Sequence, residues 1–364
     1  MLSAIDFGFT FDQNLDIGSR GYETILNYGG IGIPRLSGLI GEQSGFYVSL
    51  GFNYENDPFG FVPEILRTEV SLRSGFMELR IGRMHYQDPL AFIVTGLFDG
   101  LSFSYNTLLG KVSTGVWYSG LLYKGRANIE MTYDEFEHNF ADLDYYDFLN
   151  TYFAPRRLLA ALEWEHQGIG ELVLAQLSLL TQFDLSGAGL NTQYLTGRVF
   201  IPIWWPVAFN LGGSLSSFQV SNQIYIAHAG EIGFSFQDQI RRFAFTFRSA
   251  SGPSEYFTSF LPITTISQGN ILKAKLSGIS HISMDYTMRL HRTFTFNFSG
   301  FYFFENGPNE RWLGPELSAG LFWNPISDIS INLGGGIFIP ALGDVRPESN
   351  NYWRLDLRLI LSII

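Results

Sequence analysis

Cysteine is absent from the 364 residues, which excludes disulfide bonds and any metal site built on thiolates. Every apolar stretch is broken by glycine, serine, threonine or a charge before it reaches about 18 residues, so transmembrane helices are excluded. Charged residues make up only 16% of the chain, against roughly 25% in ordinary soluble domains. The net charge of −11 argues against a nucleic-acid partner, which requires a concentrated basic surface.

Apolar residues that alternate with polar ones are, by contrast, abundant. In the stretch from residue 75 to 105, Met77, Leu79 and Ile81 recur at every second position, and Leu101 and Phe103 repeat the pattern after a short link. This spacing predicts a β-hairpin with one apolar face and one polar face.

The same division recurs in nearly every segment, and no segment is convincing as a helix that would cover an apolar sheet face. A barrel in lipid satisfies this pattern, because hydrocarbon takes the apolar face and every backbone amide finds a neighbouring strand. We therefore predict an all-β fold, a transmembrane antiparallel up-and-down β-barrel of about 18 strands, with 16 as the alternative. No linker interrupts the chain, so residues 1–364 are expected to form one domain.

Alternation begins almost at the first residue, and no signal peptide precedes it. We interpret the sequence as a mature chain whose leader has been removed, placed in the outer membrane of a diderm bacterium. Its surroundings would then be membrane lipid with a lipopolysaccharide-type outer leaflet.

Some boundaries are less distinct than others. Gln13–Arg20 is expected to form a turn and Pro34–Ser44 a link, while Asn270–Leu290 is expected to be one strand. Pro155–His166 suits a strand or a short amphipathic helix, and we favour the strand. Short turns alternate with longer ones along the second half of the chain, which predicts that the two kinds lie on opposite sides of the membrane.

Alternation stops between Lys124 and Phe153, where aspartate, glutamate and tyrosine accumulate. We predict a long acidic extracellular loop at about 124–153, which folds into the pore as a constriction or caps its mouth. The acidic cluster could hold calcium. It lacks the glycine and the closing glutamate of an EF-hand loop, so a solvated loop is the preferred interpretation.

Catalytic motifs are missing. The six histidines show no metal-ligand spacing, and no GxSxG, Walker or zinc pattern occurs. A barrel-embedded hydrolase would need a serine or aspartate near a histidine such as His85 or His281, but a polar lining role is the preferred interpretation of both. We therefore expect no enzyme, no catalytic or metal-binding residue and no cofactor.

The polar phase of the strands provides the candidate pore lining. Its predicted bases are Arg67, Arg73, Arg80, Arg157, Arg198, Arg242, Arg248, Lys273, Lys275, Arg289, Arg354 and Arg358. Its predicted acids are Glu69, Glu78, Glu163, Glu165, Glu231, Asp285, Glu316 and Asp356. For any single residue, a neutralising pair across two strands is the simpler role. The excess of bases in the wall nevertheless predicts a preference for anions.

The segment RIGRMHYQDPLAFIVTGLFDGLSFSY resembles the pattern of alginate-export-type outer-membrane porins. In that pattern a strand ends in Gly-Arg, here Gly82-Arg83, and a loop leads to Phe-Asp-Gly, here Phe98-Asp99-Gly100. Where the family usually has glutamine after Gly-Arg, this chain has Met84. The resemblance covers about 25 residues and implies 18 strands, a pore for anionic or sugar-like solutes, and Arg83 as a residue of the pore mouth.

The leading functional hypothesis is a porin, a channel for passive diffusion of small hydrophilic solutes, anionic or sugar-like, through a polar lumen. The alternative is a plugged barrel that acts as a surface adhesin or as a scaffold subunit of an outer-membrane assembly. A soluble propeller or solenoid is a third reading, which the lack of a fixed repeat disfavours. Whether a periplasmic or lipoprotein partner binds is left open.

Overall fold

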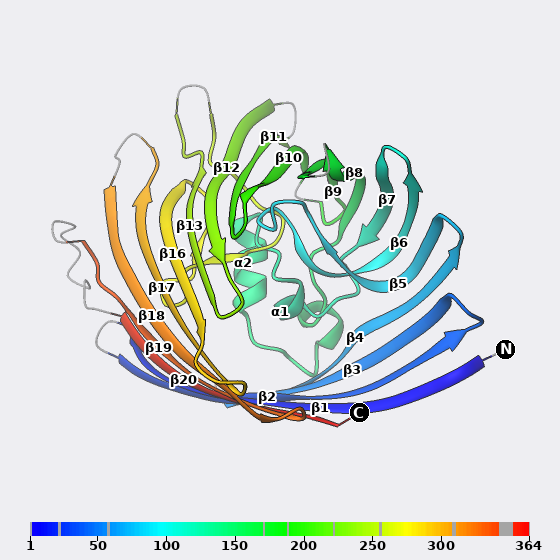
Figure 1. Cartoon of the computed structure of the whole chain (residues 1–364), viewed down its shortest axis with the longest axis horizontal. Coiled ribbons are helices and arrows are strands. Elements are labelled where there is room, and N and C mark those ends of the chain that lie inside the picture. Colours follow the sequence, from blue (N-terminus) through cyan, green and yellow to red (C-terminus); the bar gives the residue numbers. More distant parts are fainter. Residues whose placement is uncertain are drawn as a thin grey trace.

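The structure is a computed structural model that describes residues 2–363 except 21–22, 57–58, 170–171, 188, 221–222, 255–256, 308–310 and 342–351. Within these residues, 18 antiparallel strands form one closed sheet, because each strand pairs with the next and the last pairs with the first (Figure 1). The predicted fold class and strand number are confirmed.

The first half of the barrel consists of β1 (Leu2–Arg20), β2 (Glu23–Ile40), β3 (Ser44–Asn56), β4 (Phe59–Ser74), β5 (Met77–Gln87), β6 (Thr95–Thr107), β7 (Gly110–Tyr118), β8 (Arg157–Ile169) and β9 (Val173–Asp184). The second half consists of β10 (Leu190–Trp204), β11 (Val207–Val220), β12 (Gln223–Gln237), β13 (Arg241–Ala250), β16 (Ile279–Arg289), β17 (Phe294–Glu305), β18 (Arg311–Ile326), β19 (Ile329–Phe338) and β20 (Tyr352–Ile363). A separate small sheet pairs β14 (Ser267–Gln268) with β15 (Ala274–Lys275).

Alternation determines which side chains face outward. Ile81, Leu101 and Val116 lie directly opposite one another on β5, β6 and β7, and all three are exposed. Arg80 and Ser102 form the neighbouring pair and face the interior. Directly opposed residues share a face of the sheet, so the register carries the apolar phase around the outside of the barrel.

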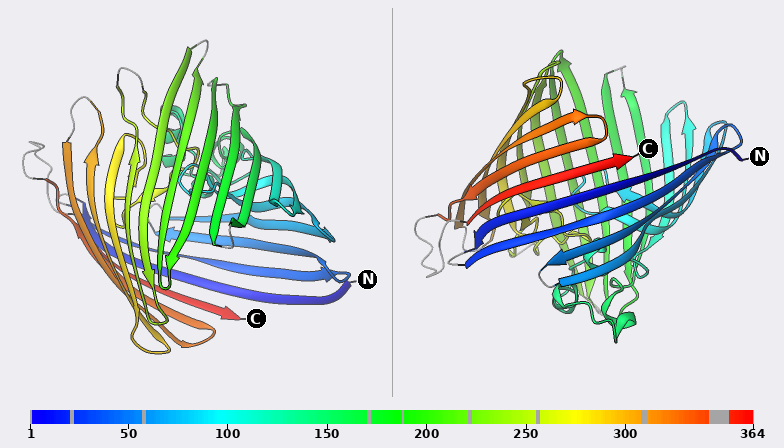
Figure 2. Two further views of the ribbon diagram at one scale, coloured as in Figure 1. Left: turned by 45° about the horizontal axis from the view of Figure 1, so that its top comes forward. Right: turned by 90° about the horizontal axis from the view of Figure 1, so that it is seen from below.

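The connections differ at the two ends of the barrel. At one end the strand bounds leave no more than four residues for any turn, as between β4 and β5 or between β18 and β19. At the other end lie residues 88–94, 119–156, 251–278 and 339–351. The chain begins β1 and finishes β20 at the short-turn end (Figure 2). The predicted segregation of short and long connections is confirmed.

Four predicted boundaries can now be compared with the structure. Pro155–His166 contains strand residues, since β8 begins at Arg157, so the strand was correctly preferred over the helix. The turn expected at Gln13–Arg20 is wrong, because β1 continues to Arg20, and the link expected at Pro34–Ser44 is largely the second half of β2. The strand expected from Asn270 begins only at Ile279.

Two connections from the long-loop end, residues 88–94 and 251–278, pack on each other inside the barrel. The backbone N–H groups of Ile263 and Thr264 donate to the carbonyl of Ile93 at 2.7 and 3.2 Å. The rings of Phe92 and Phe260 meet edge to face with their centroids 6.3 Å apart. Both rings are fully buried, so part of the lumen holds an apolar core.

The third connection, residues 119–156, contains α1 (Lys124–Ala127), α2 (Tyr133–Phe140) and α3 (Phe148–Thr151). The right-hand view of Figure 2 shows these helices at the lower rim of the barrel. Thr132 and Glu135 begin α2 with a reciprocal capping box, each side chain accepting a hydrogen bond from the other's backbone N–H. No helix of the described residues is long and apolar enough to cross a membrane.

Candidate functional site in the barrel lumen

Two arginines share one glutamate on the interior face of β4 and β5. Arg67 and Arg80 lie 2.7 and 2.6 Å from the two carboxylate oxygens of Glu69. The Glu69 side chain is 7% exposed, whereas the side chains of Arg67 and Arg80 are 39% and 29% exposed. This first triad therefore presents two accessible cations over one covered anion and carries a net positive charge.

A second group of the same kind lies on β10, β12 and β13. Arg248 contacts Glu231 at 2.8 Å, and Arg198 approaches the same carboxylate to 3.9 Å. Asn210 bridges them, because it accepts a hydrogen bond from Arg198 at 2.8 Å and donates one to Glu231 at 2.6 Å. This second triad again leaves one positive charge uncompensated on the lumen wall.

The second triad also holds the inward-folded connections. Arg198 donates to the carbonyl of Pro89 at 3.0 Å, and Arg248 donates to Gln268 at 2.7 Å. The guanidinium of Arg248 stacks over the ring of Phe92 at 5.2 Å. Arg198 and Arg248 thus hold the inward-folded connections in place. The same contacts restrict the rotamers of the two arginines.

A buried carboxylate shapes the connection between β5 and β6. Asp88 is 2% exposed and accepts hydrogen bonds from the backbone N–H groups of Leu90, Ile93 and Val94 at 2.9 to 3.0 Å. Burial raises the pKa of Asp88, and these backbone donors oppose the rise. The Asp88-Pro89 link is therefore a structured turn that points apolar side chains into the lumen.

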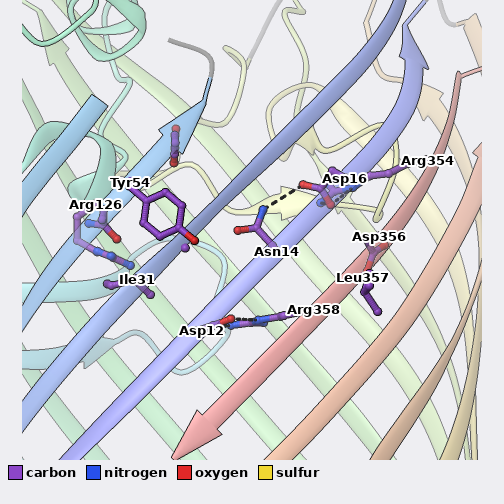
Figure 3. Close-up of a pocket in the computed structure, with 13 residues that line it drawn as sticks. Asp12, Asn14, Asp16, Ile31, Tyr54, Arg126, Arg354, Asp356, Leu357 and Arg358 are labelled. Carbon is purple, nitrogen blue, oxygen red and sulfur yellow. Dashed lines mark hydrogen bonds and ion pairs between the residues drawn. The ribbon is translucent and has the colours of Figure 1, made fainter. Parts of the chain in front are cut away.

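A third group of charges lies where the first and last strands meet. Arg354 pairs with Asp16 at 2.7 Å, and Arg358 pairs with Asp12 at 2.5 Å. Figure 3 shows both ion pairs beside a pocket of about 440 Å³, which Asp356 also lines. Here acids outnumber bases, since Asp356 lies beside the two ion pairs, in contrast to the two triads.

Other predicted lining residues are held by partners outside the two triads. Arg73 pairs with Glu78 at 2.8 Å. Arg157 is completely buried, and its guanidinium donates to Glu135 of α2 at 2.5 and 3.0 Å. Glu163 accepts the hydroxyl of Tyr86 at 2.9 Å. Arg157 therefore anchors the loop that covers it and does not reach open lumen.

Three predicted residues support the connection between β13 and β16. Lys273 and Lys275 belong to that connection and not to a barrel strand, and burial lowers the pKa of both ammonium groups. Glu316 is fully buried and accepts the backbone N–H groups of Asn270 and Leu272 at 2.5 and 2.8 Å.

Two basic residues and one acidic residue remain on the interior phase of β13 and β16. Asp285 accepts the hydroxyl of Ser299 at 2.7 Å. Arg242 and Arg289 are exposed near the short-turn end of these strands.

Arg83 lies on the same strand phase of β5 as the exposed Ile81, and not on the interior phase. It lies two residues beyond Ile81 and directly opposite Asp99, which lies two residues before the exposed Leu101. Its guanidinium contacts both carboxylate oxygens of Asp99 at 2.7 and 2.9 Å. The Gly-Arg and Phe-Asp-Gly residues that carry the resemblance are thus cross-strand partners. Arg83 is 6% exposed and also donates to the carbonyls of Ile65 and Leu121, so it is buried in the wall instead of lining the pore.

Strand phase alone did not identify several acids that neutralise the predicted bases. Asp16 lay in the segment expected to be a turn, and Glu64 and Glu135 meet Arg126 and Arg157 only through the folded 119–156 connection. The alternation of Asp12, Asn14 and Asp16 was the available signal, because it extends the first strand. Among the described residues, no group of three or more histidines and carboxylates is placed to hold a metal ion.

No protein-family profile and no curated protein sequence matches the chain. Several solved structures, however, superpose on the chain. OccK2 (OpdF) of Pseudomonas aeruginosa, in complex with glucuronate, superposes with a TM-score of 0.72 at 13% identity over 99% of this chain and 98% of that one. OccAB1 of Acinetobacter baumannii gives 0.67 at 10% identity over 99% and 97%. OpdK of Pseudomonas aeruginosa with vanillate gives 0.66 at 10% identity over 98% of each chain.

These likenesses span essentially whole chains at very low identity, so they establish the architecture and leave individual residues open. A structure of OpdK is described as that of an outer membrane protein. The chain shares the closed barrel fold of the Occ and Opd outer-membrane proteins.

Proposed function

We propose that the protein is an outer-membrane porin through which small anionic solutes diffuse passively. The observation that carries this proposal is the repeated arrangement of two lumen arginines over one covered glutamate. Each triad keeps a net positive charge on the lumen wall. Fixed charge of this kind attracts counter-ions within roughly one Debye length, about 8 to 10 Å at ordinary salt.

The orientation of the barrel follows from its connections. We propose one domain over residues 1–364, with the long acidic loop at about 124–153 facing the cell exterior. The start of β1 and the end of β20 would then face the periplasm. The apolar outer phase would contact membrane lipid, including a lipopolysaccharide-type leaflet on the outer side. A periplasmic or lipoprotein partner would meet the short-turn end.

The solute class draws on the structural neighbours. OccK2 was solved with glucuronate and OpdK with vanillate, both small carboxylates. A carboxylate fits an exposed guanidinium that offers two parallel N–H donors. The local resemblance to alginate-export-type porins, on Gly82-Arg83 and Phe98-Asp99-Gly100, supports an anionic or sugar-like solute in the same way.

The test is the reversal potential of single channels in a salt gradient. Replacing Arg67, Arg80, Arg198 and Arg248 by glutamine should move the reversal potential toward cation preference, most strongly at low salt, where screening is weakest. The control is Arg241→Gln, which removes one exposed arginine paired with Asp238 at a short turn. A wild-type channel that already prefers cations would contradict the proposal.

A plugged barrel serving as adhesin or scaffold is the second candidate, and the apolar core between the inward-folded connections favours it. Conductance of the wild-type protein in a planar bilayer separates the two functions. A porin gives discrete open-channel currents, whereas a plugged barrel gives none.

A further inference from the structure

The barrel wall is incomplete between β4 and β5. The two strands form only seven residue pairs, from Thr68 with Arg83 to Ser74 with Met77. On its other side, β4 pairs with β3 as far as Phe59. In the described part of the chain, Phe59–Arg67 therefore has a neighbouring strand on one side only, and we call this strip the β4 seam.

Side chains satisfy the free backbone of the β4 seam. The hydroxyl of Tyr145 donates to the carbonyl of Phe61 at 2.5 Å and accepts its N–H at 3.1 Å. The hydroxyl of Tyr152 donates to Pro63 at 2.8 Å, and Arg83 donates to Ile65 at 2.5 Å. The acceptors lie at every second residue, as they would opposite a strand.

Two residues of the sequence suit an edge at this place. Pro63 has no N–H to leave unpaired, and proline within a sheet belongs at an edge. Gly82 has a φ of +116°, and a Cβ built on it would lie 1.8 Å from the carbonyl oxygen of Thr68. A glycine is therefore required where β5 begins to diverge from β4.

The sealing connection also faces outward with apolar side chains. Tyr133, Phe136 and Phe140 occupy one face of α2 and are exposed, as is Tyr145. Tyr145 lies against Phe61, which belongs to the apolar outer phase of β4. The contact of Tyr145 with β4 brings this connection beside the apolar outer phase, where membrane acyl chains would meet it.

The inner side of the seam has the opposite chemistry. Arg67 ends the unpaired strip and belongs to the first triad with Glu69 and Arg80. Leu66 lies beside it at a register shift and is 9% exposed. A molecule crossing the seam would thus keep an apolar tail among lipid while its head met two arginines.

We propose that the β4 seam is a lateral portal between the lumen and the lipid phase for amphiphiles with an anionic head and an apolar chain. The portal goes beyond the proposed function, and it requires only that the barrel is embedded in a membrane. Its seal consists of side chains, the hydroxyls of two loop tyrosines and the guanidinium of Arg83, instead of a paired strand, so it opens without breaking the β-ladder. Burial, with the charge of Glu64 next in effect, raises the pKa of Tyr152 to about 12, which keeps this donor protonated at physiological pH.

The experiment uses Leu66→Cys labelled with bimane in vesicles, since the chain has no other cysteine. The probe is 2-bromododecanoate, whose bromine lies beside the carboxylate and quenches bimane on contact. We expect saturable quenching that becomes at least twofold stronger in Tyr145→Phe/Tyr152→Phe and weaker in Arg80→Gln. If the double variant does not fold, each single variant is measured instead.

The bimane quenching experiment has two controls. Tyr146→Phe removes the hydroxyl of an exposed neighbour outside the seal and should behave as wild type. Bimane at Ser214→Cys reports a lumen position on β11, which is paired on both sides, and should show no tyrosine-dependent change. Equal quenching in wild type and double variant, or equal quenching at positions 66 and 214, would overturn the portal. Anion conductance, measured on the same samples, tests the porin separately.

Discussion

At the scale of single residues, Gly82 shows how much of the wall depends on one backbone conformation. Its φ of +116° and the 1.8 Å approach of a built Cβ to Thr68 leave no room for a side chain. Gly82→Ala should destabilise the barrel by about 1–3 kcal/mol from backbone strain alone. Urea unfolding of the folded barrel in detergent, followed by gel mobility, measures the loss.

Gly197→Ala provides the matched control. Gly197 lies on β10, and the nearest atom to its built Cβ is 3.9 Å away, so alanine should be tolerated. Equal stability of the two variants would show that Gly82 can relax and does not determine where the strands diverge.

Charge pairing shows where residue-level prediction from the sequence ends. Strand phase placed Arg67, Arg80 and Arg248 on the interior face, because alternation is a local property. It could not place Glu64 or Glu135 beside their arginines, since those contacts join segments 62 and 22 residues apart through a folded loop. Arg83 shows a different limit: the family resemblance implied a place at the pore mouth, but its strand phase and its partner Asp99 hold it within the wall.

At the scale of elements, the connection of residues 119–156 is part of the wall and not only an obstacle in the pore. Deleting Glu130–Tyr146 removes α2, the Tyr145 seal and Glu135, the nearer carboxylate partner of the buried Arg157, and leaves only Asp184 at 4.0 Å. We expect higher single-channel conductance together with a loss of stability that approaches about 3–5 kcal/mol, the usual cost of breaking a buried ion pair.

Arg157→Met in the deletion background separates the two effects. It removes the buried charge that has lost Glu135, so it should restore most of the stability while conductance stays high. A deletion variant as stable as wild type would show that the loop is a simple cover, as a sequence-based view of a solvated acidic loop implies.

Element boundaries were predictable where alternation was long and regular, as in β5, β6 and β7. The predicted boundaries were wrong where the interior-facing residues were polar enough to resemble a turn, as in β1. The predicted facing of residues was wrong where a register shift exchanged inward and outward positions. Counting alternate positions back from Val70 would put Leu66 on the outer face, but the register shift opposite Ser49 and Leu50 turns Leu66 inward and exposes Ile65. Such a bulge has no signature in the alternation itself.

At the scale of the whole molecule, the outside of the barrel should behave as a lipid-facing surface. Single cysteines at Val116, Leu317 or Leu357, each exposed in the outer phase, should react with reagents confined to the membrane. A cysteine at Arg289, which is exposed on the interior phase of β16, is the control and should react with a water-soluble thiol reagent instead. Ready labelling of all three outer positions by the water-soluble reagent would show that the phases are reversed.

The ion pairs between β1 and β20 bear on how the barrel is completed during assembly. These two strands come from opposite ends of the chain, so the last step of folding must find one register among several. Arg354 with Asp16 and Arg358 with Asp12 each join residues two positions off the direct pairing. A slip of one residue would turn both arginines into the hydrocarbon, whereas a slip of two in one direction would set each arginine directly opposite its own aspartate. The charges at the junction thus act against closures that would reverse the inner and outer faces of the two strands.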